Sequence, residues 1–521
     1  MEAALRIYGR PGTIARFSFL QKLVAAAALV ALADHLFFFQ RLGATLGLFA
    51  AALLAALLLT HPALRRGAAL AATTAAFVYA IALADDPSLL AACLFWTATS
   101  LAVLLPRSRF DDGWRWAKRL LIHWLCPPLG LVVDLGGLRA ARRRHGPIAT
   151  SSRLRAIWLP LVGTILFLAL FASANPLIAN ALDRLDLLTL LAGLSFTRLG
   201  FWILAAILVW GQIRPRRFRL RAAVARDGLA ALPGVSTASI MLSLLAFNAV
   251  FALENGLDIA FLWSGAKLPP GMTLADYTHR GAYPLIATAL LAGLFVLVTL
   301  RPGSPIAEVA AIRRLVYLWI GQNVLLVAST ILRTLDYVDA YSLTRLRIAA
   351  LVWMALVAIG LVLICWRIGQ RRSGAWLINA NLVAAGLALT ACAFVDLGAI
   401  AARWNVGHAR EVGGDGAGLD LCYLNGLDAS ALLPLIDLEA RPLPPALRAR
   451  VGWTRNLLMD RLGDSQADWH GWTWRGDRRL TRARALVALR RLPRFHADRR
   501  PCDGSLPPPA PPAPLTPPVR E

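Results

Sequence analysis

The sequence has little charge for its length. Of its 521 residues only 16% are charged, whereas 58% are hydrophobic and the mean hydropathy is +0.58. A soluble domain has roughly 45–50% apolar residues, so this composition excludes an ordinary soluble fold. Lysine is almost missing, with three lysines against 52 arginines. No fold requires that bias, and we interpret it as the codon usage of a GC-rich bacterial genome.

The standard catalytic signatures are also missing from the sequence. It has no P-loop, no paired metal-binding histidines on one helical face, no Gly-x-Ser-x-Gly elbow and no cluster of cysteines with histidines. Gly414, Gly416 and Gly418 follow no strand pattern and open no helix pattern, so they do not indicate a dinucleotide loop. We therefore expect no catalytic residues, no metal ion and no cofactor, and a non-enzymatic role is favoured.

Cysteine is scarce, and the six cysteines are scattered along the chain. No pair has the spacing of a metal site. Cys93, Cys365 and Cys392 fall in apolar runs. If the C-terminal tail is extracytoplasmic, Cys422 and Cys502 could form a disulfide, and two unpaired thiols are an equal alternative.

What the sequence does have is long apolar runs. A helix needs about 20 apolar residues to cross a hydrocarbon core of roughly 30 Å. Eleven segments meet or approach this criterion, which predicts an all-α, polytopic membrane helix bundle. The predicted crossings are 20–39, 43–60, 68–84, 88–106, 156–173, 197–213, 235–253, 283–300, 314–334, 348–366 and 375–396.

The basic residues predict the direction of the bundle, since Lys and Arg mark cytoplasmic loops. With a cytoplasmic N-terminus and eleven crossings, 29 basic residues fall in cytoplasmic segments and eight in outer connections. We therefore expect a multi-pass protein of the bacterial inner (plasma) membrane with an extracytoplasmic C-terminus. The net charge of +25 then indicates anionic lipids at the basic cytoplasmic loops as a partner, not nucleic acid. No protein partner is indicated.

The segment 120–138 is long enough to cross but has strongly basic flanks on both sides. A crossing would place one flank outside, so we predict an interfacial or re-entrant hairpin with Trp114, Trp116 and Trp124 at headgroup level. The resulting organisation has five parts. They are a four-helix membrane segment (1–106), a basic cytoplasmic loop with the hairpin (107–155), a seven-helix membrane core (156–396), an extracytoplasmic tail (397–505) and a Pro-rich disordered end (506–521).

The tail has helical patterning at 427–438 and 443–462, with Asp428 a plausible N-cap of the first. The polyproline-type composition after residue 506 cannot form a core. We expect a small, mostly helical tail.

Polar residues recur along the ninth predicted helix. Gln322, Ser329, Arg333 and Asp336 follow at intervals of seven, four and three, which places them on one helical stripe. Polar groups at membrane depth are costly and normally face the bundle interior or a wet cavity. The alternative is that they form interhelical hydrogen bonds that hold the bundle together.

The stripe leads to an outer connection rich in tyrosine and charge. The preceding outer connection, which contains Glu254 and Asp258, is also mixed in charge, so we expect a polar cleft on the outer face. The alternative is that these charges are solvated or pair across loops. Asp34, His35 and Asp396 are expected to be interfacial, and Asn248, Asn379 and Asn381 to make packing hydrogen bonds. The candidate site comprises Gln322, Ser329, Arg333, Asp336, Tyr337, Asp339, Tyr341, Arg345, Asp276, Tyr277, His279 and Arg280.

Three motifs carry a family resemblance. They are DYTHRGAYPLIATALLAGLFVL at 276–297, ILRTLDYVDAYSLTRLRIAALVWM at 331–354, and ARWNVGHARE at 402–411 followed by LDLCYL at 419–424. Over roughly residues 150–430 the chain resembles the bacterial membrane family known as domain of unknown function 4173, with its related 4153 group. The first 150 residues and the Pro-rich end lie outside the resemblance. It implies a multi-helix inner-membrane protein of uncharacterised activity and supplies no site residues.

Three classes of function follow from the polar pattern. The first is a transporter with a polar cleft on the extracytoplasmic side, which a water-filled path to Gln322 would support. The second is a signalling or scaffold protein that binds a ligand or partner outside the membrane, which a closed and packed bundle would support. The third is an envelope-modifying membrane enzyme, in which His279 with nearby acids would transfer protons.

Overall fold

The computed structural model describes six continuous ranges of the chain and a few isolated positions. The ranges are 16–107, 112–125, 195–215, 236–264, 309–495 and 500–506, and the isolated positions are 110, 127, 128, 130, 133, 134, 164, 288, 291 and 295. Within them the secondary structure is helical, without a strand. The chain divides into two compact units, one of residues 1–110 with 115–222 and the other of residues 111–114 with 223–521.

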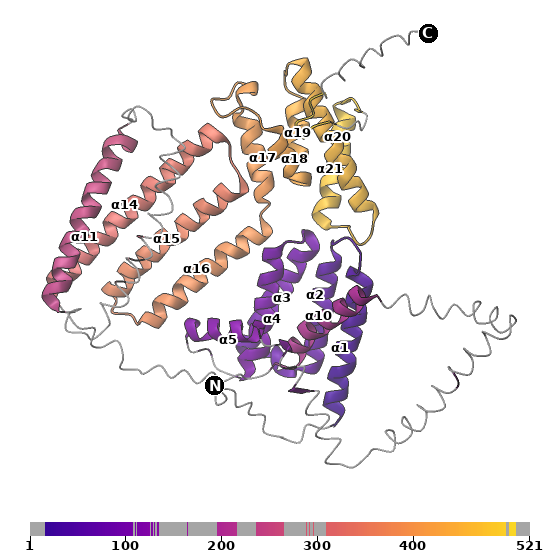
Figure 1. The fold of residues 1–521 in the computed structure, drawn as a ribbon, viewed down its shortest axis with the longest axis horizontal. Coiled ribbons are helices and arrows are strands. Elements are labelled where there is room, and N and C mark those ends of the chain that lie inside the picture. The colour runs from indigo at the N-terminus through magenta and orange to yellow at the C-terminus, as the bar shows by residue number, and fades with distance from the viewer. Residues whose placement is uncertain are drawn as a thin grey trace, which may run out of the picture. The chain divides into compact units, whose positions relative to one another are not determined.

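Unit 1 contains a bundle of apolar helices, in which short connections join α1 to α2, α2 to α3 and α3 to α4 (Figure 1). Helix α1 runs antiparallel to α10, since Asp34 of α1 meets Arg198 while Phe19 meets Trp210. Helices α2 and α3 approach closely at Gly47, where a Cβ atom would lie 2.6 Å from Cβ of Ala84. The helices are α1 (Arg16–Phe37), α2 (Thr45–Thr60), α3 (Gly67–Asp85), α4 (Leu89–Leu104), α5 (Gly113–Leu125) and α10 (Phe196–Ile213), with a 3-10 turn η1 (Pro62–Arg65) before α3.

The membrane part of unit 2 is a row of helices (Figure 1), namely α11 (Thr237–Asp258), α14 (Ala310–Tyr341), α15 (Arg345–Gly369) and α16 (Gly374–Phe394). Neighbours in the row pack against each other in this order. Side chains of Ser236, Thr344 and Ser373 accept backbone hydrogen bonds and so define where α11, α15 and α16 begin. A π-helical turn, η3 (Ile259–Trp263), extends α11.

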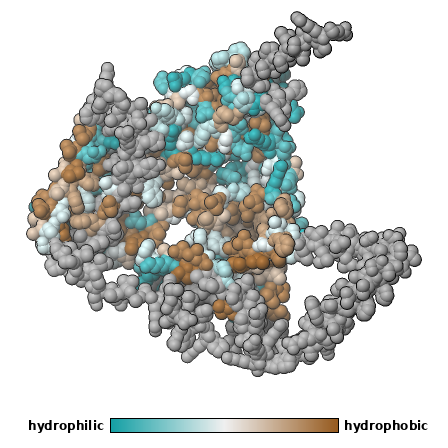
Figure 2. All heavy atoms as spheres, viewed as in Figure 1, coloured by the Kyte–Doolittle hydropathy of each residue, from teal (hydrophilic) through white to brown (hydrophobic). Residues whose placement is uncertain are grey.

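The rest of unit 2 forms a compact helical domain, called here the C-terminal domain. Its helices are α17 (Leu397–His408), α18 (Leu421–Gly426), α19 (Leu432–Glu439), α20 (Pro445–Ala467) and α21 (Trp474–Leu489). They share one core built largely of leucine. Hydrophilic residues gather on its surface, in contrast to the brown apolar helices (Figure 2). A disulfide joins Cys422 to Cys502, which resolves the open alternative in favour of pairing.

The helices agree with most of the predicted crossings. Nine of the eleven segments coincide with described helices, while 156–173 and 283–300 lie outside the described residues. Seven described helices are long and apolar enough to cross a membrane, and α2 and α4, with 16 residues each, are shorter apolar helices. The chain is thus a multi-pass membrane protein, and the total of eleven crossings stays a prediction.

Two helices extend beyond the predicted crossings, and one N-cap prediction was wrong. Helix α11 continues to Asp258, five residues beyond 253, and α14 continues to Tyr341, seven residues beyond 334. In the tail, Asp428 is not an N-cap: it lies inside the 3-10 turn η5 (Asp428–Ala431) with a positive φ of 53°. The helical segment predicted at 427–438 is instead this turn followed by α19.

The predicted hairpin is described only in part. Residues 113–125 form α5, in which Trp114 and Trp124 are exposed but Trp116 is buried and stacks on Phe110. Asp134 pairs with Arg214 at 2.8 Å and accepts a hydrogen bond from Trp210. The Pro-rich end beyond residue 506 and the first 15 residues lie outside the described residues.

Candidate functional site

A polar seam joins α11 to α14. Asn248 on α11 donates to the carbonyl of Leu315 at 3.1 Å, and Asn255, seven residues on, donates to the carbonyl of Gln322 at 3.3 Å. Both pairs have the same sequence offset of 67 residues, so the two helices run parallel. A parallel orientation is expected for these two helices, because they are the seventh and ninth predicted crossings and alternate crossings run in the same direction. The Gln322 side chain also donates to Asn248 at 3.4 Å.

A buried ion pair closes the end of the seam nearest the C-terminal domain. The Arg333 guanidinium contacts the carboxylate of Asp258, and their side chains are only 5% and 1% exposed. Glu254, one turn earlier on α11, lies 3.8 Å from the same guanidinium. Next to this pair, Trp263 of the π-turn donates to Ser329 at 3.1 Å. Charged groups at such a position need a partner because their burial is costly.

Several amide oxygens beside the seam have no hydrogen-bond partner within the described structure. They are the side-chain oxygens of Asn255, Gln322 and Asn323, each buried. Most buried polar atoms in proteins are hydrogen-bonded. Unsatisfied acceptors at membrane depth are therefore places where water or a polar solute would be stabilised.

The structure separates the predicted site into parts. Gln322, Ser329 and Arg333 make contacts in the seam, whereas Asp336 and Asp339 are exposed. Four further candidates, Asp276, Tyr277, His279 and Arg280, lie outside the described residues.

Tyr337, Tyr341 and Arg345 belong to a junction between α14, α15 and the C-terminal domain. The rings of Tyr337 and Tyr341 lie 4.6 Å apart, and Arg347 lies 4.4 Å above Tyr337. The backbone N–H of Arg345 donates to the Tyr423 hydroxyl at 2.9 Å, and its guanidinium donates to Ser430. These contacts fix the domain to the helix ends.

The junction is completed by an amide clamp and a shared core. Asn405 of α17 accepts from the N–H of Leu343 at 2.7 Å and donates to the carbonyl of the same residue at 3.0 Å. Val338 of α14 and Leu343 belong to the same hydrophobic core as α17 to α21. Gly398 makes room for Arg345, because a Cβ there would lie 2.4 Å from its Nη2. Helix α14 therefore connects the seam rigidly to the C-terminal domain.

Asp396 has a structural role, not merely an interfacial one. Its carboxylate caps α17 by accepting from the N–H of Ala399 at 2.9 Å, and it pairs with Arg479 at 2.5 Å. Burial acts to raise its pKa. The hydrogen bond from Ala399 and the charge of Arg479 outweigh burial, so the pKa of Asp396 lies below its ordinary value.

Sequence reasoning missed the acidic half of the seam. It assigned Glu254 and Asp258 to a loop and did not single out Asn255. The signal that could have found them is their spacing, because Asn248, Asn255 and Asp258 follow at seven and three residues and so share one helical face. The predicted packing role of Asn248 fits its bond to Leu315.

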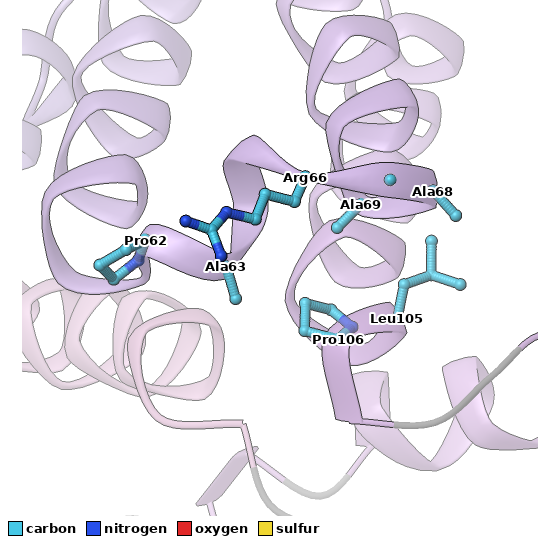
Figure 3. A pocket seen from close by; sticks show the side chains of 8 residues that line it. Pro62, Ala63, Arg66, Ala68, Ala69, Leu105 and Pro106 are labelled. Carbon is cyan, nitrogen blue, oxygen red and sulfur yellow. The ribbon is translucent and has the colours of Figure 1, made fainter.

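A separate cleft of about 470 Å³ lies at the α2–α3 connection of unit 1. Figure 3 shows Arg66 reaching back over η1 toward Pro62 and Ala63, with Leu105 and Pro106 across the opening. Arg66 is exposed, and Lys22 lies 3.5 Å from His61 near the same connection. This end of the unit is basic.

Apolar helices that enclose a polar seam and carry a polar helical domain define a multi-pass membrane protein. Comparison with protein families then identifies the group. The family described as domain of unknown function DUF4153 matches residues 23–438, most of the chain, and the protein belongs to that family. Membership of the 4173 group is not shown, and the match begins near residue 23, well before the predicted residue 150. No curated protein and no solved structure matches the chain.

Proposed function

We propose that the protein is a transporter of a small polar or charged solute, in which the α11–α14 seam lines part of the path. The Arg333–Asp258 pair supports this proposal most directly, since it closes one end of a row of polar groups that continues to Gln322. A buried ion pair adds little net stability on average. Ionisable groups inside membrane bundles usually mark solute or proton pathways.

Cysteine accessibility tests the proposal without knowledge of the solute. The four cysteines outside the disulfide, Cys93, Cys126, Cys365 and Cys392, are first replaced by serine. Single changes Gln322→Cys and Ser329→Cys are then probed with a charged, membrane-impermeant methanethiosulfonate reagent. We expect slow labelling that accelerates at least tenfold when Asp258→Asn breaks the ion pair.

The matched control is Leu318→Cys on an exposed face of the same helix, where the thiol would contact lipid. A charged reagent should not label it. Absence of labelling at Gln322→Cys and Ser329→Cys, both with and without Asp258→Asn, would exclude a wet path through the seam.

A second function is favoured by the junction. Because α14 and the C-terminal domain share one core, a displacement of α14 would be passed to the domain, as in a signalling or scaffold protein that binds a ligand or partner. A dry seam in every variant would support this alternative. The third class, an envelope-modifying enzyme, depends on His279, which lies outside the described residues.

We further propose the bacterial inner membrane, a cytoplasmic N-terminus and an extracytoplasmic C-terminal domain. The loop charges support this orientation, and so does the disulfide, since disulfides persist in oxidising compartments. Reporter fusions after residues 145, 275 and 415 test it. A cytoplasmic signal at 415 would overturn the orientation.

The basic end of unit 1 supports the proposal that anionic lipids bind at the cytoplasmic loops. The cleft at Arg66 is wide enough for a headgroup, and an exposed guanidinium suits phosphate. Charge-reversal Arg66→Glu should weaken retention of phosphatidylglycerol during purification, whereas Arg410→Glu in the C-terminal domain should not.

A further inference from the structure

An apolar pocket of about 230 Å³ lies in unit 1, between α1, α2, α3, α4 and α10. All fourteen residues that line it are apolar, among them Phe37, Phe49, Phe95, Phe201 and Leu204. The pocket is open on one side, where Leu204 is 57% exposed. Its volume is below the roughly 300–1,000 Å³ of pockets that enclose a whole small-molecule ligand. It suits part of a flexible apolar chain.

A polar group lies directly beside this pocket. Asp34 follows Ala33, a residue of the pocket wall, in the sequence of α1. Its carboxylate accepts hydrogen bonds from the Arg198 guanidinium at 2.9 Å and 2.5 Å. The same carboxylate accepts from the Trp202 indole at 2.9 Å, and Trp202 neighbours Phe201 in the wall. The apolar pocket therefore has a fixed polar rim.

Arg198 retains binding capacity at this rim. Within the described structure its Nε and Nη2 atoms bond to Asp34, which leaves the Nη1 group with two N–H donors. Its side chain is 37% exposed and lies 5.3 Å from the ring of Phe38 and 5.6 Å from that of Trp202. The guanidinium is thus held in place by a carboxylate and two aromatic rings, with one edge open.

An apolar pocket with an oriented arginine at its edge matches an amphipathic molecule. We propose that unit 1 binds one glycerophospholipid, with part of an acyl chain in the pocket and the phosphate against Nη1 of Arg198. Arginine forms directional, charge-assisted hydrogen bonds with phosphate. Phospholipids surround any membrane protein, so the ligand is supplied by the bilayer itself. This site is independent of the proposed transport seam.

Native mass spectrometry of the full chain tests the site. The protein is purified in mild detergent and supplied with phosphatidylglycerol or phosphatidylethanolamine of defined chain length. We expect one phospholipid to remain bound to the wild type. Leu204→Trp, which fills the open side of the pocket, and Arg198→Gln, which removes the phosphate contact, should each lower the bound fraction about tenfold.

The controls separate a specific site from general lipid adhesion. Leu199→Trp adds the same bulk on α10 outside the pocket, and Arg41→Gln removes an exposed arginine. Both should bind as the wild type does. If Arg198→Gln fails to fold because Asp34 loses its partner, Asp34→Asn with Arg198→Gln replaces it.

Three results would overturn the proposal. One is unchanged retention in both test variants, and the second is equal loss in the controls. The third is a bound molecule without phosphate, such as a quinone.

Discussion

The C-terminal domain contains a buried ion pair between Arg455 and Glu439. Their side chains are 1% and 0% exposed, and Arg455 Nε donates to Glu439 at 2.8 Å. Arg455 also donates to the carbonyl of Pro493 at 2.7 Å, and Asn456 to that of Phe495 at 2.9 Å. The pair thereby holds the segment after α21 against α20.

Removal of one partner of the Arg455–Glu439 pair should therefore lower the free energy of unfolding. Glu439→Leu leaves the Arg455 charge buried without compensation, and we expect a loss of about 3–5 kcal/mol of stability. Thermal unfolding of the full chain in detergent, followed by tryptophan fluorescence, measures it. The double change Glu439→Leu with Arg455→Met should recover most of the loss, and failure to recover would show that packing, not charge, matters here.

Asp396 gives a pH dependence with a defined sign. Because its folded pKa is depressed, its stabilising contribution is complete above the ordinary value of about 3.9 and is lost as the pH falls through the folded pKa. Asp396→Asn should thus be less stable than wild type at pH 7. The gap should narrow below about pH 4, whereas a gap that stays constant to pH 3 would refute the assignment.

Among single residues, the sequence predicted that Arg333 lies in a polar stripe but did not identify its ion-pair partner. Spacing on one helix is readable from the chain, whereas the pairing of Arg333 with Asp258, or of Arg198 with Asp34, joins residues 75 and 164 positions apart. Asp258 was assigned to a loop because the hydropathy falls before Glu254. The ion pair with Arg333 offsets the free-energy cost of burying the Asp258 carboxylate. A hydropathy average does not include such pairing.

Helices were the best-predicted elements, because long apolar runs leave few alternatives in a membrane. The ends were less predictable. Helix α14 has 32 residues and so spans about 48 Å at 1.5 Å per residue, well beyond a hydrocarbon core of roughly 30 Å. Its last turns contain Asp336 and Asp339, and the sequence analysis assigned them to a loop. They continue as helix because the C-terminal domain packs on Val338.

Close packing of α2 and α3 depends on Gly47. A side chain at this position would meet Ala84 and the carbonyl of Ala80 at 2.6–2.7 Å. We expect Gly47→Leu to separate the helices and to lower the melting temperature of the full chain by several degrees. Gly200→Leu is the matched control, since nothing lies within 4 Å of a Cβ at Gly200. Equal effects of the two changes would contradict this account.

For the whole molecule, the disulfide ties the distant end of the chain to α18. Cys422 and Cys502 are separated by 80 residues. Cross-linking a loop of that length stabilises the fold by about 4.5 kcal/mol in the chain-entropy treatment. Cys422→Ser should lower the stability of the C-terminal domain by an amount of that order, as should reduction of the wild type. Cys392→Ser, which alters a free cysteine, should have little effect.

Composition and loop charge predicted the class of molecule, a helical multi-pass membrane protein, because the bilayer constrains both. The compactness of the C-terminal domain was not predictable from those signals. Its core joins Leu421, Leu435 and Leu458 from three separate helices, and only tertiary packing brings them together.

The two asparagine contacts of the seam are copies of each other, one heptad apart. If α14 slid by seven residues, about 10.5 Å, Asn248 would meet the carbonyl of Gln322 just as Asn255 does now. Backbone carbonyls repeat along any helix, so the asparagines alone cannot tell these alignments apart. The Arg333 and Asp258 charges occur once each, and their pairing selects a single alignment. The ion pair therefore fixes the axial register of α11 against α14.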